Sequence, residues 1–298
     1  MDPQAERDRQ LRLVDATAAR IMRSMHAEFN KVATSASRGF RRNLSAGAME
    51  ALAGHQERVT AILIKGLDPL IARFAADVMG GNGKKALLGI ETKVEEGFGK
   101  NPNKTDENEE LALLLLLLIG RFSESWNATY IDTTSTQIAE TTNRQLTRNV
   151  ALAVEEMDSL SESMTPNEAQ ARAATGLRTA ILGTMISRAD TIGNTSAHTT
   201  SQAAILGTAE ELDNVSRGQI VNFKQWISRG DSRVRSTSKG DAFGHVQTNG
   251  QVKPLGQPFQ VPRKNGTTEA TMYPGDPSSS AGNSINCRCV MSLTTMPN

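Results

Sequence analysis

After Asn214 the chain changes from one residue pattern to another, and few folds accommodate both. Before this point, apolar residues recur at steps of three and four, which is the period of an amphipathic helix. The clearest example is the stripe Leu11, Val14, Ala18, Ile21, Met25, Phe29 and Val32. After it, short β-prone runs are separated by glycines and by Pro254, Pro258, Pro262, Pro274 and Pro277. The two patterns predict an α+β fold, with a largely helical N-terminal two-thirds and a small C-terminal α+β module of short strands.

The helical part is expected to hold several helices beyond this stripe. One is predicted over residues 48–79, interrupted or ended near Asp68-Pro69, because proline disfavours a helical residue before it. Another is expected to start near Glu109. Thr165-Pro166-Asn167-Glu168 has the residues of a capping box and predicts the start of a helix that reaches Met185. A separate helix is expected over about residues 190–212.

The strands and the domain boundary follow from the same reading. Strands are predicted in the β-prone runs Ile220–Ile227, Gly250–Val252, Phe259–Val261 and Ile285–Leu293. The capping box marks the boundary between two expected domains. These are a helical region over residues 1–165, which carries no motif that we can place, and a C-terminal module over residues 166–298.

Composition restricts the classes of function. Lys and Arg total 33 against 32 Asp and Glu, so the whole chain gives no case for a nucleic-acid binder. The charge is uneven, however: residues 1–46 are net +4, residues 47–216 net −9 and residues 217–298 net +6. Such asymmetry suggests an anionic partner for one of the basic ends. The longest apolar run, Leu111–Ile119, has nine residues, whereas a helix needs about 20 to cross a bilayer, so we expect no membrane-spanning segment.

Five short motifs stand in a fixed order in the C-terminal third. They are Trp226, Asp231, Arg233 and Arg235; His245, Asn249, Gly250 and Gln251; Pro254, Pro258 and Phe259; Tyr273, Pro274, Gly275, Asp276 and Pro277; and Asn286, Cys287, Arg288 and Cys289. This order resembles the phage Mu F-like minor head protein family, also called phage head morphogenesis proteins. Arg188-Ala189-Asp190 is similar to the family's upstream helix motif. There is one departure: the family usually has the histidine two or three residues after the arginine pair, whereas here nine residues, 236–244, intervene before His245.

The resemblance implies a virion protein and a structural role. Family members are minor capsid proteins inside the phage head, present in few copies and associated with the portal. They assist head assembly and the packaging or ejection of DNA. For this chain, the resemblance implies the portal protein, other head proteins and packaged DNA as partners, with residues 1–165 docking on the proteins. It implies a location in the virion interior, and in the host cytoplasm during assembly.

Basic residues of the C-terminal module are candidates for contact with DNA phosphates. They are Arg229, Arg233, Arg235, Lys239, Lys253, Arg263, Lys264 and Arg288. A second set lies near the N-terminus, at Arg7, Arg9, Arg12, Arg38, Arg41 and Arg42. Few aromatic residues accompany the basic residues of the module, so we expect contact with the DNA backbone that is non-specific and sensitive to salt. An ordinary solvated surface is the alternative.

The only two cysteines of the chain raise the question of a metal. Cys287 and Cys289 are one residue apart, so a disulfide between them would be strained. On a strand both would point to the same face, where His245 and an aspartate such as Asp231 or Asp276 could complete a tetrahedral Zn²⁺ site. The alternative is two buried thiols in a strand core, with His245 as a hydrogen-bonding residue and no cofactor.

One pattern suggests an enzyme instead. Arg235 followed by Ser236-Thr237-Ser238 is reminiscent of ADP-ribosyltransferases, which also need a Glu-x-Glu or Gln-x-Glu pattern downstream. The only glutamate after residue 238 is Glu269, and that pattern is absent. With an incomplete catalytic set we expect no enzyme and assign no catalytic residue; a toxin-like or ADP-ribosyltransferase-like enzyme is the alternative.

Overall fold

The computed structural model describes residues 3–78, 117, 119–216 and 223–294. Most of the helical residues lie in α1 (Pro3–Met49), α2 (His55–Val78), α5 (Asp132–Leu160) and α6 (Pro166–Ser216). A 3₁₀ turn (Glu50–Leu52) follows α1 and a π-helical turn (Asn127–Ile131) precedes α5. The chain divides into two compact units; α1, α2 and α6 each contribute residues to both, and α5 lies within one. Unit 1 comprises residues 1–18, 66–126 and 194–298, and unit 2 comprises residues 19–65 and 127–193.

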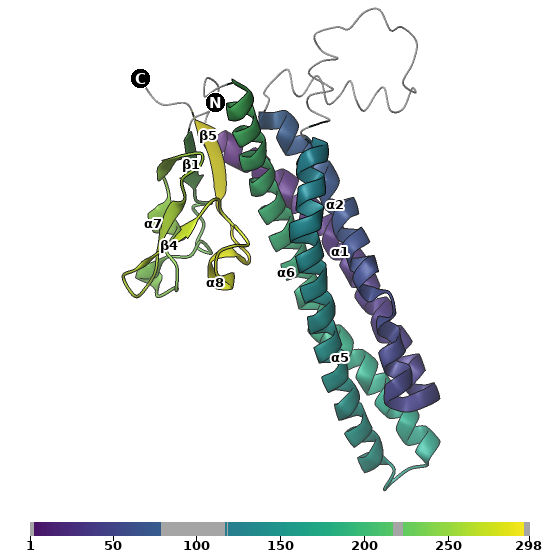
Figure 1. The fold of residues 1–298 in the computed structure, drawn as a ribbon. Helices are drawn as coiled ribbons and strands as arrows, with labels where there is room; N and C mark the ends of the chain where they lie inside the picture. The colour runs from purple at the N-terminus through teal and green to yellow at the C-terminus, as the bar shows by residue number, and fades with distance from the viewer. Residues whose placement is uncertain (1–2, 79–116, 118, 217–222, 295–298) are drawn as a thin grey trace, which may run out of the picture. The chain divides into compact units, whose positions relative to one another are not determined.

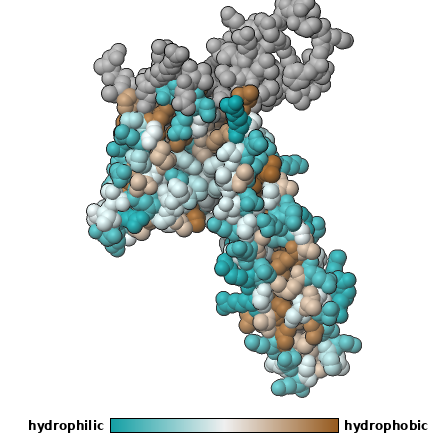
Figure 2. Space-filling model, viewed as in Figure 1, coloured by the Kyte–Doolittle hydropathy of each residue, from teal (hydrophilic) through white to brown (hydrophobic). Residues whose placement is uncertain are grey.

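Unit 2 consists of helical segments that run lengthwise beside one another (Figure 1). Its centre is apolar and fully buried, and includes Ile21, Met25, Phe29, Phe40, Val59, Leu63, Leu146, Leu177, Ile181 and Met185. One buried ionic group supplements it: the carboxylate of Glu28 lies 2.9 Å from Nδ1 of His55 and 2.8 Å from Nε of Arg58. Glu28 therefore joins α1 to α2. On the face drawn in Figure 2, apolar patches stand between the polar side chains of these helices.

The stripe predicted from Leu11 to Val32 is confirmed, because all seven of its residues are buried in α1. The capping box is confirmed as well. The backbone N–H of Thr165 donates to the Glu168 carboxylate at 3.1 Å, and the N–H of Glu168 donates to the Thr165 hydroxyl at 3.4 Å. These two bonds satisfy amides that the first turn of α6 leaves without helical partners.

Two helix predictions are wrong. The helix does not stop at Pro69, which lies inside α2. The flanking Leu67, Leu70 and Ile71 are almost completely buried, and this packing outweighs the hydrogen bond that proline cannot make. The helices expected on either side of residues 186–189 are one continuous helix, α6. The start expected near Glu109 lies outside the described residues.

The C-terminal part of unit 1 holds the strands. β1 (Phe223–Ile227) is central in an antiparallel sheet of order β2-β1-β5, with β2 at Val252–Pro254 and β5 at Val290–Thr294. β3 (Phe259–Pro262) and β4 (Thr268–Thr271) form a second antiparallel pair. Short helices α7 (His245–Thr248) and α8 (Ala281–Ser284) and a 3₁₀ turn (Thr237–Lys239) connect them. The α+β class predicted from the sequence is confirmed, although β4 was not predicted.

Glutamines cover the edge of the three-stranded sheet at β5. The N–H of Met291 donates to Oε1 of Gln202 in α6 at 2.6 Å, and its carbonyl accepts from Nε2 of Gln10 in α1 at 3.2 Å. Both glutamines are buried. Leu11, Ile227 and Val290 pack together beside them. An edge strand exposes unpaired backbone groups, and here side chains from two helices of unit 1 satisfy them.

The expected domain boundary coincides with the start of α6 at Pro166. The assignment of residues 1–165 and 166–298 to separate domains stays a prediction. Within the described part of the chain, every helix is too short or too polar to cross a bilayer.

Candidate metal centre

The imidazole of His245 stands at the centre of the C-terminal module. His245 is the first residue of α7 and is 1% exposed. Trp226 of β1 meets its ring edge-on, with the ring centroids 5.5 Å apart, and Phe259 of β3 meets Trp226 in the same way at 5.4 Å. Trp226 therefore holds the tilt of the imidazole, and Phe259 in turn holds Trp226.

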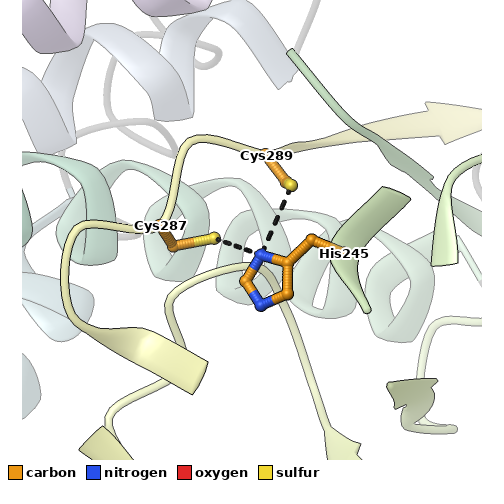
Figure 3. Close-up of side chains that lie close together, drawn as sticks. All are labelled: His245, Cys287 and Cys289. Carbon is orange, nitrogen blue, oxygen red and sulfur yellow. Dashed lines mark hydrogen bonds between the residues drawn. The ribbon is translucent and has the colours of Figure 1, made fainter. Parts of the chain in front are cut away.

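Cys287 and Cys289 approach this imidazole from the segment that leads into β5 (Figure 3). The Sγ atom of Cys287 lies 3.7 Å from Nδ1 of His245, and that of Cys289 lies 3.6 Å from the same nitrogen. All three residues are buried, and their ligand atoms lie within 4.8 Å of one another. The three residues predicted as a metal group are therefore brought together by the fold.

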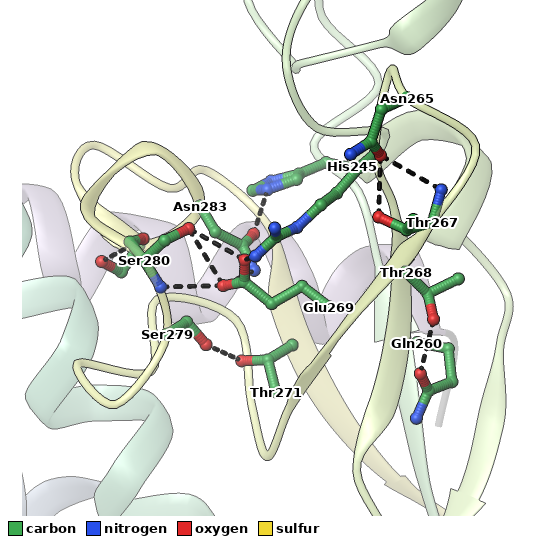
Figure 4. Close-up of polar contacts among 12 residues, drawn as sticks. His245, Gln260, Asn265, Thr267, Thr268, Glu269, Thr271, Ser279, Ser280 and Asn283 are labelled. Carbon is green, nitrogen blue, oxygen red and sulfur yellow. Dashed lines mark hydrogen bonds and ion pairs between the residues drawn. The ribbon is translucent and has the colours of Figure 1, made fainter.

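A chain of hydrogen bonds supports the other side of the ring (Figure 4). Nε2 of His245 donates to Oδ1 of Asn283 in α8 at 2.8 Å, and Nδ2 of Asn283 donates to Oε1 of Glu269 in β4 at 3.2 Å. Glu269 also accepts from the N–H of Ser280 at 2.8 Å and pairs with Arg263. We call His245, Asn283 and Glu269 the relay. It holds the ring with Nδ1 facing the thiols.

Burial and neighbours set the ionisation of the two thiols apart. Burial alone would raise the pKa of Cys287, but its interactions with Cys289, His198 and His245 outweigh burial and lower that pKa below its usual value. The pKa of Cys289 is raised, first by burial and then by the neighbouring Cys287. Two adjacent sulfurs titrate as a pair, so the first proton leaves readily and the second with difficulty.

The first motif forms a second cluster, around the carboxylate of Asp231. Its Oδ2 lies 3.1 Å from Arg288, 3.5 Å from Arg229 and 3.7 Å from Arg233. Burial would raise the pKa of Asp231, but the N–H of Arg233 and the charges of Arg288 and Arg233 lower it. Asp231 is thus committed to arginines and does not belong to the group of candidate ligands among the described residues.

The nine residues before His245 close on themselves. The N–H of Ser236 donates to Oδ2 of Asp241 at 2.8 Å, and the N–H of Asp241 donates back to the carbonyl of Ser236 at 3.2 Å. The N–H of Val246 consequently reaches the carbonyl of Arg235 at 3.0 Å. The departure from the family spacing therefore forms a closed loop that leaves Arg235 and His245 as neighbours.

Two motif turns each place a glycine where the backbone has a positive φ. Gly250 and Gly275 each have a φ of +81°. Each is the third residue of a four-residue turn, in which the N–H of the fourth residue donates to the carbonyl of the first. This is a type II turn, which favours glycine at its second central position. The side chain of Asn249 accepts the N–H of Ser228 at 2.7 Å, which ties the first turn to the end of β1.

The motif at Tyr273–Pro277 is a structural loop. Asp276 accepts the N–H of Met272 at 2.9 Å and the N–H of Ser278 at 2.8 Å, which closes the loop from within. Asp276, like Asp231, is therefore engaged in other contacts and is not available as a metal ligand. The hydroxyl of Thr199 in α6 donates to the carbonyl of Gly275 at 2.8 Å, so the loop rests on α6.

The remaining motif residues have separate places. Arg188 belongs to unit 2, where its guanidinium reaches Gln145 at 3.3 Å. Burial, together with the nearby charge of Arg144, lowers the pKa of Arg188. Asn286 has a positive φ of 54°, and its N–H donates to the hydroxyl of Thr195 at 3.2 Å.

A cavity of about 390 Å³ in unit 1 gathers cations beside Cys287. It is lined by Leu11, Val14, Asp15, Asn194, His198, Arg229, Arg233, Arg235, Asn286, Cys287 and Arg288. Of the eight basic residues of the C-terminal module predicted for DNA contact, Arg229, Arg233, Arg235 and Arg288 line it. Arg263 pairs with Glu269, and Lys239 donates to the carbonyl of Ser232 at 3.3 Å. The four arginines that line the cavity were all among the candidates for phosphate contact, and their contact with DNA stays a prediction.

The residues that suggested an enzyme take part in structural contacts. The guanidinium of Arg235 donates to the carbonyls of Asn283 and Ile285. The hydroxyls of Ser236 and Ser238 lie 2.7 Å apart, and Gln247 donates to the first of them at 2.9 Å. These contacts hold the segment before α7 and assemble no catalytic set among the described residues.

Sequence reasoning missed several residues of this centre. Asn283 and Glu269 carry the relay, and His198 of α6 interacts with the Cys287 thiol while its Nε2 is buried without a hydrogen-bond partner. Glu269 is the only glutamate in the β-rich segment, which was a usable signal.

Comparison of the chain with protein-family models, with curated proteins and with solved structures finds no match.

Proposed function

We propose that this chain is a minor capsid protein of a phage head, of the Mu F-like head morphogenesis kind. In this role it is associated with the portal inside the head, contacts other head proteins and assists head assembly and the packaging or ejection of DNA. It resides in the virion interior, and in the host cytoplasm during assembly.

One observation carries the proposal: the residues behind the resemblance are used to build the module. His245 and Cys287 meet at its centre, Asp231 joins three arginines, and Asp276 closes its loop. Side chains that satisfy one another in this way stabilise the fold of the module. A module of this kind suits a protein whose role is assembly.

The proposal is tested on purified particles of the phage that encodes the chain. Mass spectrometry of virions and of procapsids should find the protein in few copies relative to the portal and the major head protein. Chemical cross-linking should join it to the portal, while a host protein of similar abundance serves as the control for contamination. Absence of the chain from both kinds of particle would contradict the proposal.

Contact with the DNA backbone is the second part of the proposal, and the arginine-lined cavity supports it. Arg229, Arg233, Arg235 and Arg288 line it. The acidic groups that face them are Asp15 in its wall and Asp231, which pairs with three of the four arginines. Positive charge in excess at a concave surface favours phosphate. Binding of labelled duplex DNA should weaken steeply with salt, and Arg233→Ala should reduce the slope, because this side chain is 70% exposed. Binding that does not depend on salt would contradict this part.

A further inference from the structure

We propose that His245, Cys287 and Cys289 bind one zinc ion, through Nδ1 of the imidazole and the two cysteine sulfurs. The proposal does not depend on the phage assignment. It rests on the spacing of the three ligand atoms, on the hydrogen bonds that orient them and on the kinds of ligand present.

The spacing of the ligand atoms fits a tetrahedral ion. With Zn–S distances of about 2.3 Å and Zn–N distances of about 2.05 Å, a tetrahedral angle places sulfur and nitrogen about 3.6 Å apart. The two thiols lie 3.7 Å and 3.6 Å from Nδ1 of His245. Both sulfur–nitrogen distances therefore match those of a shared tetrahedral ion, and all three ligand atoms lie within 4.8 Å of one another.

The relay fixes the tautomer that zinc requires. Nδ2 of Asn283 donates to the carboxylate of Glu269, so the amide oxygen faces the imidazole. An oxygen can only accept a hydrogen bond, and Nε2 of His245 must therefore carry the proton. Nδ1 is left with its lone pair directed at the two sulfurs. A histidine ligand that donates its other N–H to a polar group is the usual arrangement at protein metal sites.

The ligand types select zinc among the common ions. Two thiolates and an imidazole suit zinc, whereas magnesium and calcium prefer oxygen ligands. Two thiolates also neutralise the ion, so the buried site carries no net charge. An unpaired charge there would be costly. Since Cys287 lines the cavity, the cavity offers the ion a route to the site and a source of water for the fourth position.

The ion would join parts of the chain that are distant in sequence. His245 begins α7, whereas the cysteines lead into β5, the strand that pairs with β1 along its whole length. Binding to a site that exists only in the folded state adds to the stability of that state. We therefore expect removal of zinc to loosen the docking of α7 on the sheet.

The test uses the full chain, expressed in medium with zinc and purified with a reductant. After dialysis against metal-free buffer, elemental analysis should find close to one equivalent of zinc per chain. Replacement of zinc by Co²⁺ should give the intense near-ultraviolet absorption of a thiolate–cobalt bond. The chain has two cysteines in all, so this band can only come from Cys287 and Cys289.

Variants separate this site from adventitious binding. Cys287→Ser and Cys289→Ser should each lose the ion, and His26→Asn should keep it, because His26 lies in unit 2 and pairs with Asp190. The cobalt spectrum of the unaltered chain keeps the test valid if the cysteine variants fail to fold. Folded, reduced protein with well below one equivalent of zinc and no thiolate–cobalt band would overturn the proposal.

Discussion

Replacement of Glu269 by glutamine should destabilise the C-terminal module by about 2–4 kcal/mol. The carboxylate accepts from the N–H and the hydroxyl of Ser280 at 2.8 Å and 2.9 Å and from Asn283 at 3.2 Å, and it pairs with Arg263. Its side chain is only 9% exposed. A hydrogen bond to a buried charged group contributes about 1.5–3 kcal/mol, and the amide of glutamine keeps the shape but loses the charge. It also turns an N–H toward groups that are themselves donors.

The effect should depend on pH with a definite sign. Burial would raise the pKa of Glu269, but hydrogen bonds from Ser280, Arg263 and Asn283 lower it below the ordinary value of 4.5. The folded state therefore gains stability from the ionised form above the unfolded pKa, and loses it as the pH falls through the folded pKa. The difference between the unaltered chain and Glu269→Gln should shrink below pH 4.5.

Urea unfolding at several pH values measures this difference. Trp226 is buried in the module, so in a Trp126→Phe background its fluorescence reports on the module alone. Glu162→Gln, which makes the same change at an exposed position, is the control and should change the free energy of unfolding by less than about 0.5 kcal/mol. A Glu269→Gln effect as small as that of the control, or one that persists at low pH, would refute the reasoning.

Other substitutions test separate features of the fold. Gly39→Ala should cost about 1–3 kcal/mol or more, because a Cβ there would lie 1.9 Å from the carbonyl oxygen of Gly47. Gly183→Ala, with open space around it, should stabilise α6 by about 0.5–1 kcal/mol. Both residues lie in unit 2, so their effects are measured by urea unfolding followed by helical circular dichroism. Burial lowers the pKa of Lys224 from 10.5 to about 8. The free energy of unfolding of the unaltered chain should therefore rise, relative to that of Lys224→Met, as the pH increases from about 8 to 10.5. If the two proteins showed parallel pH profiles, this prediction would be contradicted. His198→Ala should keep its zinc by elemental analysis, because His198 is not among the three ligands within reach of one ion, and loss of the ion would identify it as a fourth ligand.

Local patterns in the sequence predicted the elements that depend on local contacts. The stripe of α1 has a period of its own, and the capping box at Thr165 and Glu168 needs only four residues. The end predicted at Pro69 was wrong because the apolar neighbours of that proline are buried by other segments. β4 was missed because Thr-Glu-Ala-Thr carries no β-prone run, and its pairing with β3 provides the stability.

The candidate site was predictable only in part, for the same reason. Histidine and closely spaced cysteines are recognisable ligand types, and the fold brings His245 and both thiols together. The aspartates proposed as further ligands are used elsewhere, since Asp231 holds arginines and Asp276 closes a loop. Asn283 carries no such signal, because an asparagine 38 residues from its histidine partner has no diagnostic spacing.

The segment from α8 to β5 is where the two polar clusters of the module converge. Arg288 binds the Asp231 cluster, Cys287 and Cys289 face the imidazole of His245, and Asn283 belongs to the relay. Val290 and Met291 of this segment are buried, and the polar contacts add to this packing in specifying how the segment lies. Arg288 lies between Cys287 and Cys289 in the sequence, so a substitution that breaks the Asp231 cluster should also displace the two thiols. The order of the motifs in the sequence then reflects one requirement, which is to hold this segment against α7 and β1.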